Sequence, residues 1–571
     1  MIQTNADEFQ VSPDLRFVLL SKSRAKGSGT DHGTKYWIWG VETGYSAPLR
    51  IGSDGGHPTV QFALWMPAGA GDQLRSALLV AKENNLYYLP RADGSETYPI
   101  TTDGRPDLFH GVSDPLHTDH ILGSTVASWP SPGGSHILYL SVDAGAVRGW
   151  PYAVYGTTAG TPPSVYTVSC PRAGDVNPTL RVTVVEVSRP QQMINHVISP
   201  PRQLGSGAAY AAGVRWMDDA HVSITWYNRR QNASYVSLCT SPEWRCTLLY
   251  QTVVEMGWVE VGPAPVFCAD DPAALLLVRA EADGGRRRIV RVNITAGRTE
   301  VVSIEDDVEK VLACGAKYMY YLSSRTDRPG QRHLFRIPAN LSAAPHCMTC
   351  DLPRDAHPPL SHDCLHLDAL FTENAQHYAI LCEGPAVPHV TATSVGRSQV
   401  ALLRNNSALR ADVAAASLAP VRPLFVPLSA GGRASVRLTV PPQYRETDLV
   451  SYSLLVRVAF DPSEPPGADG VAWSVDWPAY LASQRQTVVA DVTLPVRSTG
   501  EWSPASDTSS LREVVEGLLS QLKFVDAQRV AVEGRGLGAL LALRLLAQPA
   551  SVVSCAVAFA PITSWHSYGK D

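Results

Sequence analysis

The chain has 571 residues, of which 45% are hydrophobic and 18% charged, and its formal net charge is −5 at pH 7. This length allows two or more domains with a sizeable core. The acidic balance and the lack of a basic cluster argue against a nucleic-acid-binding protein. The longest apolar helical run, Leu537–Ala547, is interrupted by Arg544 and is too short to span a bilayer.

Residues 1–415 consist of short apolar or alternating runs separated by Gly, Pro, Asn and Asp, which is the pattern of an all-β protein. The clearest runs are Phe17–Leu20, Ala77–Ala81, His136–Leu140, Arg181–Val187, Val222–Trp226 and Tyr318–Leu322. A loose turn motif precedes several strands, as in Ser12-Pro-Asp and Ser131-Pro-Gly. A turn-and-strand unit that recurs over such a length predicts a β-propeller.

Cysteines and glycosylation sequons indicate the secretory pathway. Ten cysteines are present, and several lie close together: Cys239 with Cys246, Cys347 with Cys350, and Cys364 with Cys382. Four sequons accompany them, at Asn232, Asn293, Asn340 and Asn405. This combination favours an extracellular or cell-surface glycoprotein with disulfides. Because the N-terminus has no signal-peptide layout, we expect it to be incomplete.

The pair Cys347-x-x-Cys350 could also be half of a zinc site. The nearby histidines, His346 among them, supply no second ligand pair at zinc-finger spacing. We therefore expect no metal, and no other cofactor.

The character of the sequence changes after a polar link at residues 411–423, so a second domain is expected over residues 416–571. Strands and helices alternate there, which predicts a mainly parallel α/β sheet. The expected strands are Val436–Val440, Ser453–Val458, Thr487–Val492, Arg529–Val532 and Val552–Phe559, and the expected helices are Ser509–Leu522 and Leu537–Leu546. Such a sheet normally has more strands, so we expect the C-terminus to be incomplete as well.

A glycine-dense corner, Gly534-Arg-Gly536-Leu-Gly538, joins the strand at 529–532 to the helix at 537–546. The layout is that of the nucleophile elbow of α/β-hydrolases, Gly-x-Ser-x-Gly, but Gly536 occupies the serine position. Gly534-x-Gly536-x-x-Ala539 also fits a dinucleotide-binding fingerprint, although no acidic residue follows at the usual spacing before Asp571. A plain glycine turn without chemistry fits equally well.

Several longer stretches together resemble the dipeptidyl peptidase IV group of the prolyl oligopeptidase superfamily, over essentially the whole chain. They are Cys170-Pro-Arg-Ala-Gly-Asp-Val-Asn177-Pro178, Trp226-Tyr-Asn-Arg229-Arg-Gln231-Asn232, Trp477-Pro-Ala-Tyr-Leu-Ala-Ser483, Phe524-Val-Asp-Ala-Gln-Arg-Val and Ala560-Pro-Ile-Thr-Ser-Trp565. The resemblance implies an eight-bladed propeller followed by an α/β-hydrolase domain, here partial. It also implies removal of X-Pro or X-Ala dipeptides from peptide N-termini by a dimeric type II membrane glycoprotein.

The family's site residues are replaced here. Gly536 stands for the nucleophilic serine, Leu537 for the aromatic residue after it, and Ala459 for the tyrosine that donates to the oxyanion. Asp119 and His120 stand where the family has the two glutamates that bind the substrate's ammonium group. The resemblance places Trp565 and Tyr568 at the proline-sized pocket, although ordinary core aromatics are an equal alternative, and the triad Asp and His would follow residue 571.

The resemblance supports three disulfides, Cys239–Cys246, Cys347–Cys350 and Cys364–Cys382. It leaves Cys555 unpaired. Cys268 with Cys314 is only a candidate pairing, and Cys170 has no candidate partner.

The leading hypothesis is a non-catalytic member of this family, an extracellular scaffold that binds a peptide or membrane-protein partner and can form a homodimer. One alternative is an active dipeptidyl peptidase whose sequence is truncated or locally mispredicted. Another is a fragment without independent function, because half of a hydrolase sheet would expose apolar strand edges.

Overall fold

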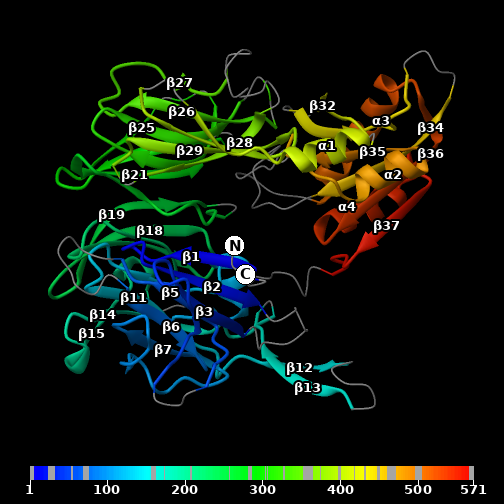
Figure 1. Cartoon of the computed structure of the whole chain (residues 1–571). Helices are drawn as coiled ribbons and strands as arrows, with labels where there is room; N and C mark the ends of the chain where they lie inside the picture. Colours follow the sequence, from blue (N-terminus) through cyan, green and yellow to red (C-terminus); the bar gives the residue numbers. More distant parts are fainter. Residues whose placement is uncertain are drawn as a thin grey trace. The chain divides into compact units, whose positions relative to one another are not determined.

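A computed structural model describes most of the chain (Figure 1). The described residues are 6–23, 33–52, 56–67, 76–155, 162–172, 174–205, 209–255, 258–280, 286–302, 304, 306–325, 328, 330–350, 364–372, 374–396, 400–416, 418–429, 433–445, 450–459, 471–494 and 504–564. They form two compact units, the first within residues 1–254 and the second within residues 255–565. Each unit is described by itself.

The first unit is a succession of antiparallel sheets, most of them four-stranded, as the alternation of short strands and turns predicts. The first sheet contains β1 (Glu8–Val11), β2 (Phe17–Ser23), β3 (Thr34–Gly40) and β4 (Ser46–Pro48), and the second contains β5 (Phe62–Trp65), β6 (Leu78–Lys82), β7 (Asn85–Leu89) and β8 (Tyr98–Pro99). The third contains β10 (Ser128–Pro130), β11 (His136–Asp143), β14 (Thr179–Glu186) and β15 (Ile194–Ile198), with β9 (Leu108–His110) also on β11. β12 (Gly149–Val154) and β13 (Ser164–Ser169) form a separate hairpin, and β16 (Ala209–Trp216), β17 (His221–Asn228), β18 (Ala233–Thr240) and β19 (Arg245–Val253) form the last sheet.

The apolar run of β11 is continuous because its two faces belong to two different cores. Ile137 and Tyr139 pack in a cluster with residues of the second sheet, such as Leu79. Leu138 and Leu140, one residue out of phase, pack in a cluster with residues of the last sheet. Successive side chains of a strand point to opposite faces, so sheets stacked face to face require apolar residues at every position. This stacking is the arrangement that the sequence predicts for propeller blades.

The second unit begins in the same manner. One four-stranded sheet contains β20 (Val266–Cys268), β21 (Asp271–Ala280), β22 (Arg287–Asn293) and β23 (Arg298–Val301). An eight-stranded sheet follows, with β24 (Asp307–Cys314), β25 (Tyr318–Ser324), β26 (Arg332–Pro338), β27 (His346–Cys347), β28 (Cys364–Phe371), β29 (His377–Pro385), β30 (His389–Ser394) and β31 (Val400–Arg404). The strand pairing between its two halves is that of β26 with β28, at Arg332 and His366. The described chain up to this point is mainly β-sheet, and the number of blades stays a prediction.

A six-stranded sheet with helices follows, in the region where the sequence predicts alternating strands and helices. Its strands, in spatial order, are β32 (Val421–Pro427), β33 (Arg433–Thr439), β35 (Thr487–Thr493), β34 (Tyr452–Ala459), β36 (Val525–Arg535) and β37 (Cys555–Phe559). The helices are α1 (Ser407–Ala415), α2 (Trp477–Arg485), α3 (Pro504–Gln521) and α4 (Leu537–Leu546). The pairs β34–β35, β34–β36 and β36–β37 are parallel, and β32–β33 and β33–β35 are antiparallel.

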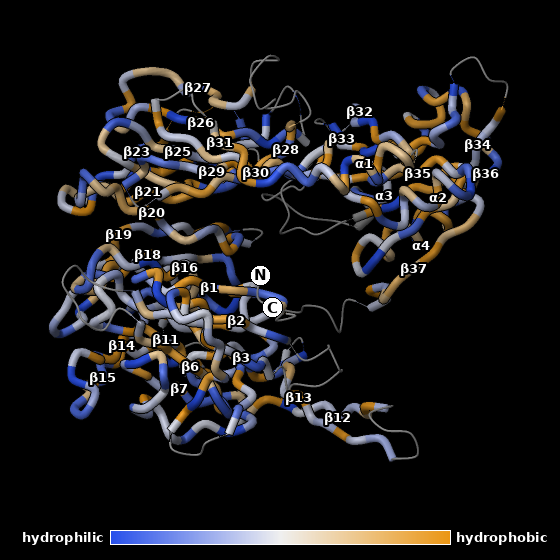
Figure 2. The backbone as a smooth tube through the Cα atoms, in the orientation of Figure 1, coloured by the Kyte–Doolittle hydropathy of each residue, from blue (hydrophilic) through white to orange (hydrophobic). Residues whose placement is uncertain are grey.

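The apolar face of α3 packs on this sheet, as its periodicity predicts. Leu511, Val514, Val515 and Leu518 are fully buried there together with strand residues such as Val456. Figure 2 colours these hydrophobic stretches of the strands and helices orange.

Two elements differ from the expected pattern. Helix α1 lies partly in the segment expected to be a polar link, and β32 forms in spite of its two prolines because it is an edge strand, where a missing N–H costs no sheet hydrogen bond.

The described residues contain four disulfides. Cys239–Cys246, Cys347–Cys350 and Cys364–Cys382 are the pairs that the family resemblance implies. The fourth, Cys268–Cys314, spans 46 residues and joins β20 to β24. Cys170 and Cys555 carry free, exposed thiols.

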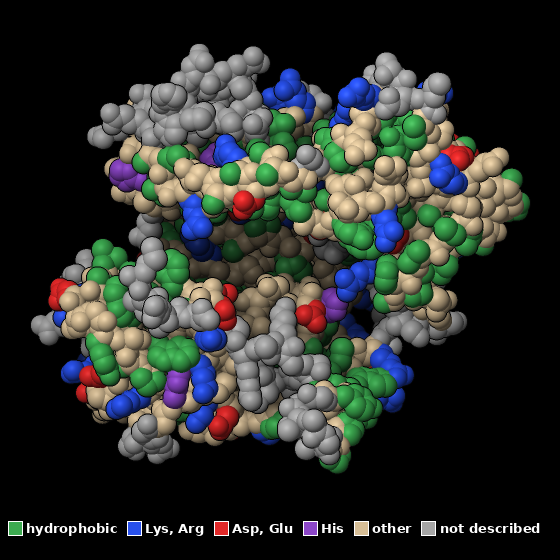
Figure 3. All heavy atoms as spheres, turned by 45° about the vertical axis from the view of Figure 1, so that its right-hand side comes forward, with side chains coloured by type: hydrophobic (Ala, Val, Ile, Leu, Met, Phe, Trp, Pro, Cys, Tyr) green, Lys and Arg blue, Asp and Glu red, His purple; other side chains and the backbone are tan. Residues whose placement is uncertain are grey.

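Figure 3 shows one face of the surface with the side chains coloured by type. On the side that Figure 3 shows, basic side chains are scattered among acidic, polar and hydrophobic ones rather than gathered into one patch. No helix in the described parts of the chain is both long enough and apolar enough to cross a lipid bilayer.

Candidate functional site

The glycine-dense corner forms the sharp turn that the sequence predicts between a strand and a helix. β36 ends at Arg535, and α4 starts at Leu537. Gly536 between them has φ 55° and ψ −114°. These angles are close to those of the first central residue of a type II′ turn, a conformation that glycine adopts without steric cost and other residues adopt only with strain.

The outer glycines of the corner allow the strand and helix to touch. A Cβ atom on Gly534 would lie only 2.2 Å from the carbonyl oxygen of Gly538. Gly536 differs, because a Cβ atom built there meets no described atom within 4 Å. The turn therefore has open space at the position that the sequence aligns with the serine of a nucleophile elbow.

The backbone of the elbow is hydrogen-bonded to the end of the next strand, β37, and to the segment that follows it. The N–H of Gly536 donates to the carbonyl of Phe559 in β37 over 2.9 Å, and the N–H of Ile562 donates to the carbonyl of Gly536 over 3.4 Å. Leu537 is buried at the start of α4. Ala459 is the last residue of β34, and the residue before it, Val458, pairs with Gly534. The structure thus brings Ala459, Gly536 and Leu537 together at one edge of the sheet.

A row of charged residues crosses the strands that lead to this edge. Arg437, Asp491, Arg457 and Glu533 are successive partners in register on β33, β35, β34 and β36. Arg457 donates to Asp491 over 2.8 Å and to Glu533 over 3.2 Å, and its side chain is 30% exposed. Burial alone would lower the pKa of Arg457, but the two carboxylates raise it overall, so the guanidinium stays charged. Each charge interrupts an apolar strand, which is the one signal in the sequence that could have revealed the row.

Asp119 and His120 belong to the first unit, where they lie on a π-helical turn, His117–Ile121. Both are exposed. Asp114, which is fully buried, holds the turn through two hydrogen bonds to His117. Its carboxylate accepts one from the backbone N–H over 3.2 Å and one from the ring Nδ1–H over 2.5 Å. The exposed carboxylate and imidazole are therefore presented to solvent by a fixed support.

The thiol of Cys170 lies in the electrostatic field of this turn. Burial raises the pKa of Cys170, and the carboxylates of Asp114 and Asp119 raise it further. The segment that carries Cys170 is bonded to the last sheet of the unit. The side-chain amide of Asn177 donates to the hydroxyl of Tyr210 in β16.

Replacing Asp119 with asparagine should therefore make Cys170 more reactive. Removing a nearby negative charge stabilises the thiolate, which is the form that is alkylated, and we expect the rate with iodoacetamide to rise roughly twofold near neutral pH. Peptide mass spectrometry would measure the rate at Cys170, with Cys555 as the internal control whose rate should stay constant. An unchanged rate at Cys170 would contradict an electrostatic influence of Asp119 on the thiol.

The remaining predicted residues are placed as follows. Trp565 and Tyr568 lie outside the described residues. Asn340 and Asn405 are exposed, and Asn232 and Asn293 are half-buried, with glycosylation of all four still a prediction.

One group of possible metal ligands occurs in the described parts of the chain, namely His333, Cys347 and Cys350, with ligand atoms within 4.8 Å of one another. Both sulfurs are bonded to each other, so they offer no thiolate.

Comparisons with known proteins agree along most of the chain. Residues 12–389 match the family described as the dipeptidyl peptidase IV N-terminal region. The chain is 25% identical to prolyl endopeptidase FAP of Mus musculus, over 100% of this chain and 74% of that protein. It is 25% identical to inactive dipeptidyl peptidase 10 of Mus musculus, over 99% of this chain and 70% of that protein. The fold is similar to that of Porphyromonas gingivalis dipeptidyl peptidase 4, with a TM-score of 0.78, 19% identity, and coverage of 98% of this chain and 76% of that one.

Proposed function

Because the chain belongs to the dipeptidyl peptidase IV family, whose N-terminal region its residues 12–389 match, we propose that it is a non-catalytic member that acts by binding. The observation that carries this proposal is Gly536, which leaves the elbow without a side chain. A serine peptidase forms an acyl-enzyme through its hydroxyl, and without one no such intermediate exists. Loss of the nucleophile alone lowers turnover by about a millionfold in serine peptidases.

Two further replacements support the same conclusion. Ala459 cannot donate a hydrogen bond to an oxyanion, and removal of one such donor costs about 3–4 kcal/mol of transition-state stabilisation. Asp119 and His120 offer one carboxylate where the family has two, so an N-terminal ammonium group is bound less strongly. The relative named inactive dipeptidyl peptidase 10 supports a non-catalytic role, and relatives named as peptidases, such as prolyl endopeptidase FAP, leave activity open.

In the proposed molecule, residues 1–415 form an eight-bladed propeller and residues 416–571 form an α/β-hydrolase-type domain. The stacked sheets of the first unit and the six-stranded sheet with its elbow support this assignment. The disulfides support an extracellular or cell-surface location. The partner is a peptide or a membrane protein, and the molecule can also form a homodimer.

An activity assay on the purified chain tests the proposal. We expect no hydrolysis of a fluorogenic Gly-Pro substrate above the buffer blank, and no labelling by a fluorophosphonate, which reacts with activated serines. The variant Gly536→Ser should fold, because its side chain enters open space, with a loss of about 1–3 kcal/mol from the strained backbone. Gly536→Ala is the matched control for that strain.

An active dipeptidyl peptidase is the second candidate, and the backbone geometry of the elbow favours it. The positive φ of Gly536 and the open space above it would accept a serine without rearrangement. Hydrolysis by the unmodified chain that a peptidase inhibitor abolishes would overturn the non-catalytic proposal. Hydrolysis by Gly536→Ser, and not by Gly536→Ala, would instead show that the rest of the machinery is competent.

A further inference from the structure

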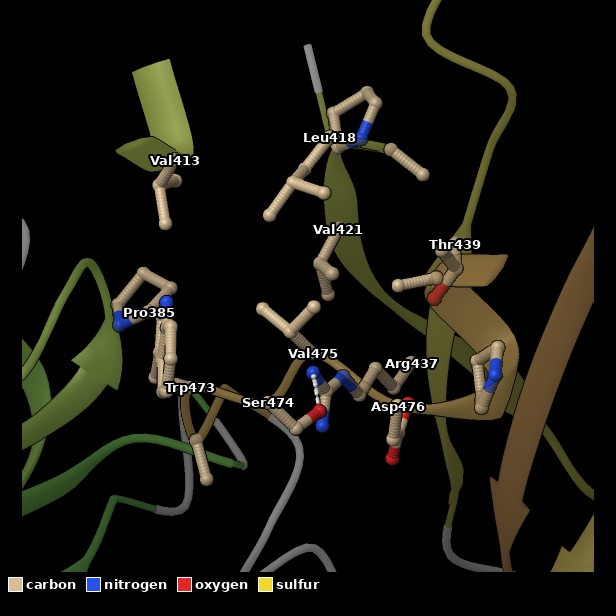
Figure 4. A pocket seen from close by; sticks show the side chains of 15 residues that line it. Pro385, Val413, Leu418, Val421, Arg437, Thr439, Trp473, Ser474, Val475 and Asp476 are labelled. Atoms are coloured by element: carbon tan, nitrogen blue, oxygen red, sulfur yellow. Dashed lines mark hydrogen bonds between the residues drawn. The ribbon is translucent and has the colours of Figure 1, made fainter. Parts of the chain in front are cut away.

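The second unit contains a cavity of about 210 Å³ that is separate from the elbow (Figure 4). Its walls come from four places in the chain: the end of β29, helix α1, the edge strand β32 with its neighbour β33, and the segment that leads into α2. The last wall is attached to β29, because the N–H of Trp473 donates to the carbonyl of Glu383 over 2.7 Å. The cavity is therefore formed by a fixed part of the unit.

Arg437 is the cation on the cavity wall, and one of its buried N–H donors is unused. Its Nη2 donates to the hydroxyl of Ser474 over 2.6 Å. Its Nε is buried and has no hydrogen-bond partner among the described residues. Asp491 is the cross-strand neighbour of Arg437, but it accepts its hydrogen bond from Arg457 over 2.8 Å.

A buried guanidinium donor without an acceptor is costly, which makes the site favourable for an acceptor from outside. The planar fork of arginine matches the two oxygens of a carboxylate. No carboxylate in the described residues lies at ion-pair distance from Arg437. Ser474 holds one edge of the guanidinium in place, so the fork is oriented before a ligand arrives.

The rest of the cavity suits an apolar body. In Figure 4 the side chains of Val413, Leu418 and Val421 lie on one side, opposite Arg437 and Ser474. Trp473 and Pro385 add further apolar surface. The volume of about 210 Å³ corresponds to roughly seven water molecules at about 30 Å³ each. The space therefore admits a group about the size of one branched aliphatic residue.

We propose that this cavity binds a small apolar carboxylate, with its two oxygens on Arg437 and its hydrocarbon part against Val413, Leu418 and Val421. The carboxylate can belong to a free short-chain acid or to the C-terminus of a peptide that ends in an aliphatic residue. Asp476 also lines the cavity, and it is exposed. It weakens the binding of an anion and disfavours ligands with a second negative charge.

The test uses isovalerate and its uncharged amide of the same shape, isovaleramide, with ligand-observed saturation-transfer NMR on the whole chain. We expect isovalerate to bind and isovaleramide to bind at least tenfold more weakly. Equal binding of the two, or no binding of isovalerate, would overturn the proposal. This readout does not involve the elbow, so it is independent of whether the chain is a peptidase.

Variants identify the site. Arg437→Gln should weaken isovalerate at least tenfold, and Arg437→Lys should weaken it less, because lysine keeps the charge and loses the fork. Arg485→Gln, a change at an exposed arginine of α2, is the matched control and should have no effect. Val421→Phe should block binding by filling the cavity while Arg437 remains, and Asp476→Asn should strengthen it. Unchanged binding in both Arg437→Gln and Val421→Phe would place the ligand elsewhere and overturn the assignment.

A pair of short peptides ending in leucine distinguishes the two sources of the carboxylate. Binding of the free-acid peptide but not of its C-terminal amide would assign the site to peptide C-termini. Binding of isovalerate alone would assign it to free acids.

Discussion

Replacing Gly534 with alanine is expected to destabilise the second unit by about 3 kcal/mol, at the upper end of the range for overpacked cores. The new Cβ would lie 2.2 Å from the carbonyl oxygen of Gly538 and 2.6 Å from the backbone N of Ala539. These are backbone atoms at the start of α4, so no side-chain rotation can relieve the clash. The helix must shift, although Leu541 and Leu545 hold it in the core without any exposed surface.

Urea unfolding monitored by tryptophan fluorescence would measure the loss. The matched control is Gly536→Ala, two residues along the same turn, where the added Cβ meets open space. That variant carries only the strain of its positive φ, about 1–3 kcal/mol, and its α4 keeps its position. A Gly534→Ala variant no less stable than the control would show that the strand and helix do not approach as closely as described.

Replacing Arg457 with methionine should cost about 2–4 kcal/mol, because it leaves two partly buried carboxylates without their counter-ion. The side chains of Asp491 and Glu533 are 28% and 18% exposed, so solvent screens them poorly. The deficit should shrink on acidification towards about pH 4, where protonation removes the unpaired charges.

The effect would be read as the difference in unfolding free energy between variant and parent at several pH values. Arg529→Met is the control, since Arg529 pairs with Asp526 over 2.8 Å at a site where its side chain is 55% exposed. An exposed pair contributes about 0–1 kcal/mol. A pH-independent deficit at Arg457 would mean that lost packing, rather than unpaired charge, causes the destabilisation.

The sequence predicted local structure well wherever neighbouring residues determine it. Helix α4 occupies Leu537–Leu546 as its periodicity predicts, and the glycine corner before it forms the expected turn. The predicted apolar face of α3 is confirmed for the same reason, because residues three and four apart lie on one side of a helix.

Long-range features could not be predicted in this way. The charge row depends on how β33, β35, β34 and β36 are ordered and aligned, and the sequence order of those strands differs from their spatial order. Arg457 and Glu533 are 76 residues apart, and only the register of two parallel strands makes them partners. The cavity at Arg437 likewise collects walls from separate segments. Cys268 and Cys314 were only a candidate pair in the sequence, because spacing alone does not select a disulfide partner.

The glycine at position 536 also bears on how such a chain can change over evolutionary time. Glycine occupies the turn without steric cost, whereas serine there would reduce stability as soon as it appeared. Its catalytic benefit would depend on further substitutions at Ala459, Asp119 and His120. An exchange of glycine for serine would therefore begin with a loss of stability, before any other substitution could offset it. Stability alone therefore favours retention of glycine at this turn over its exchange for serine.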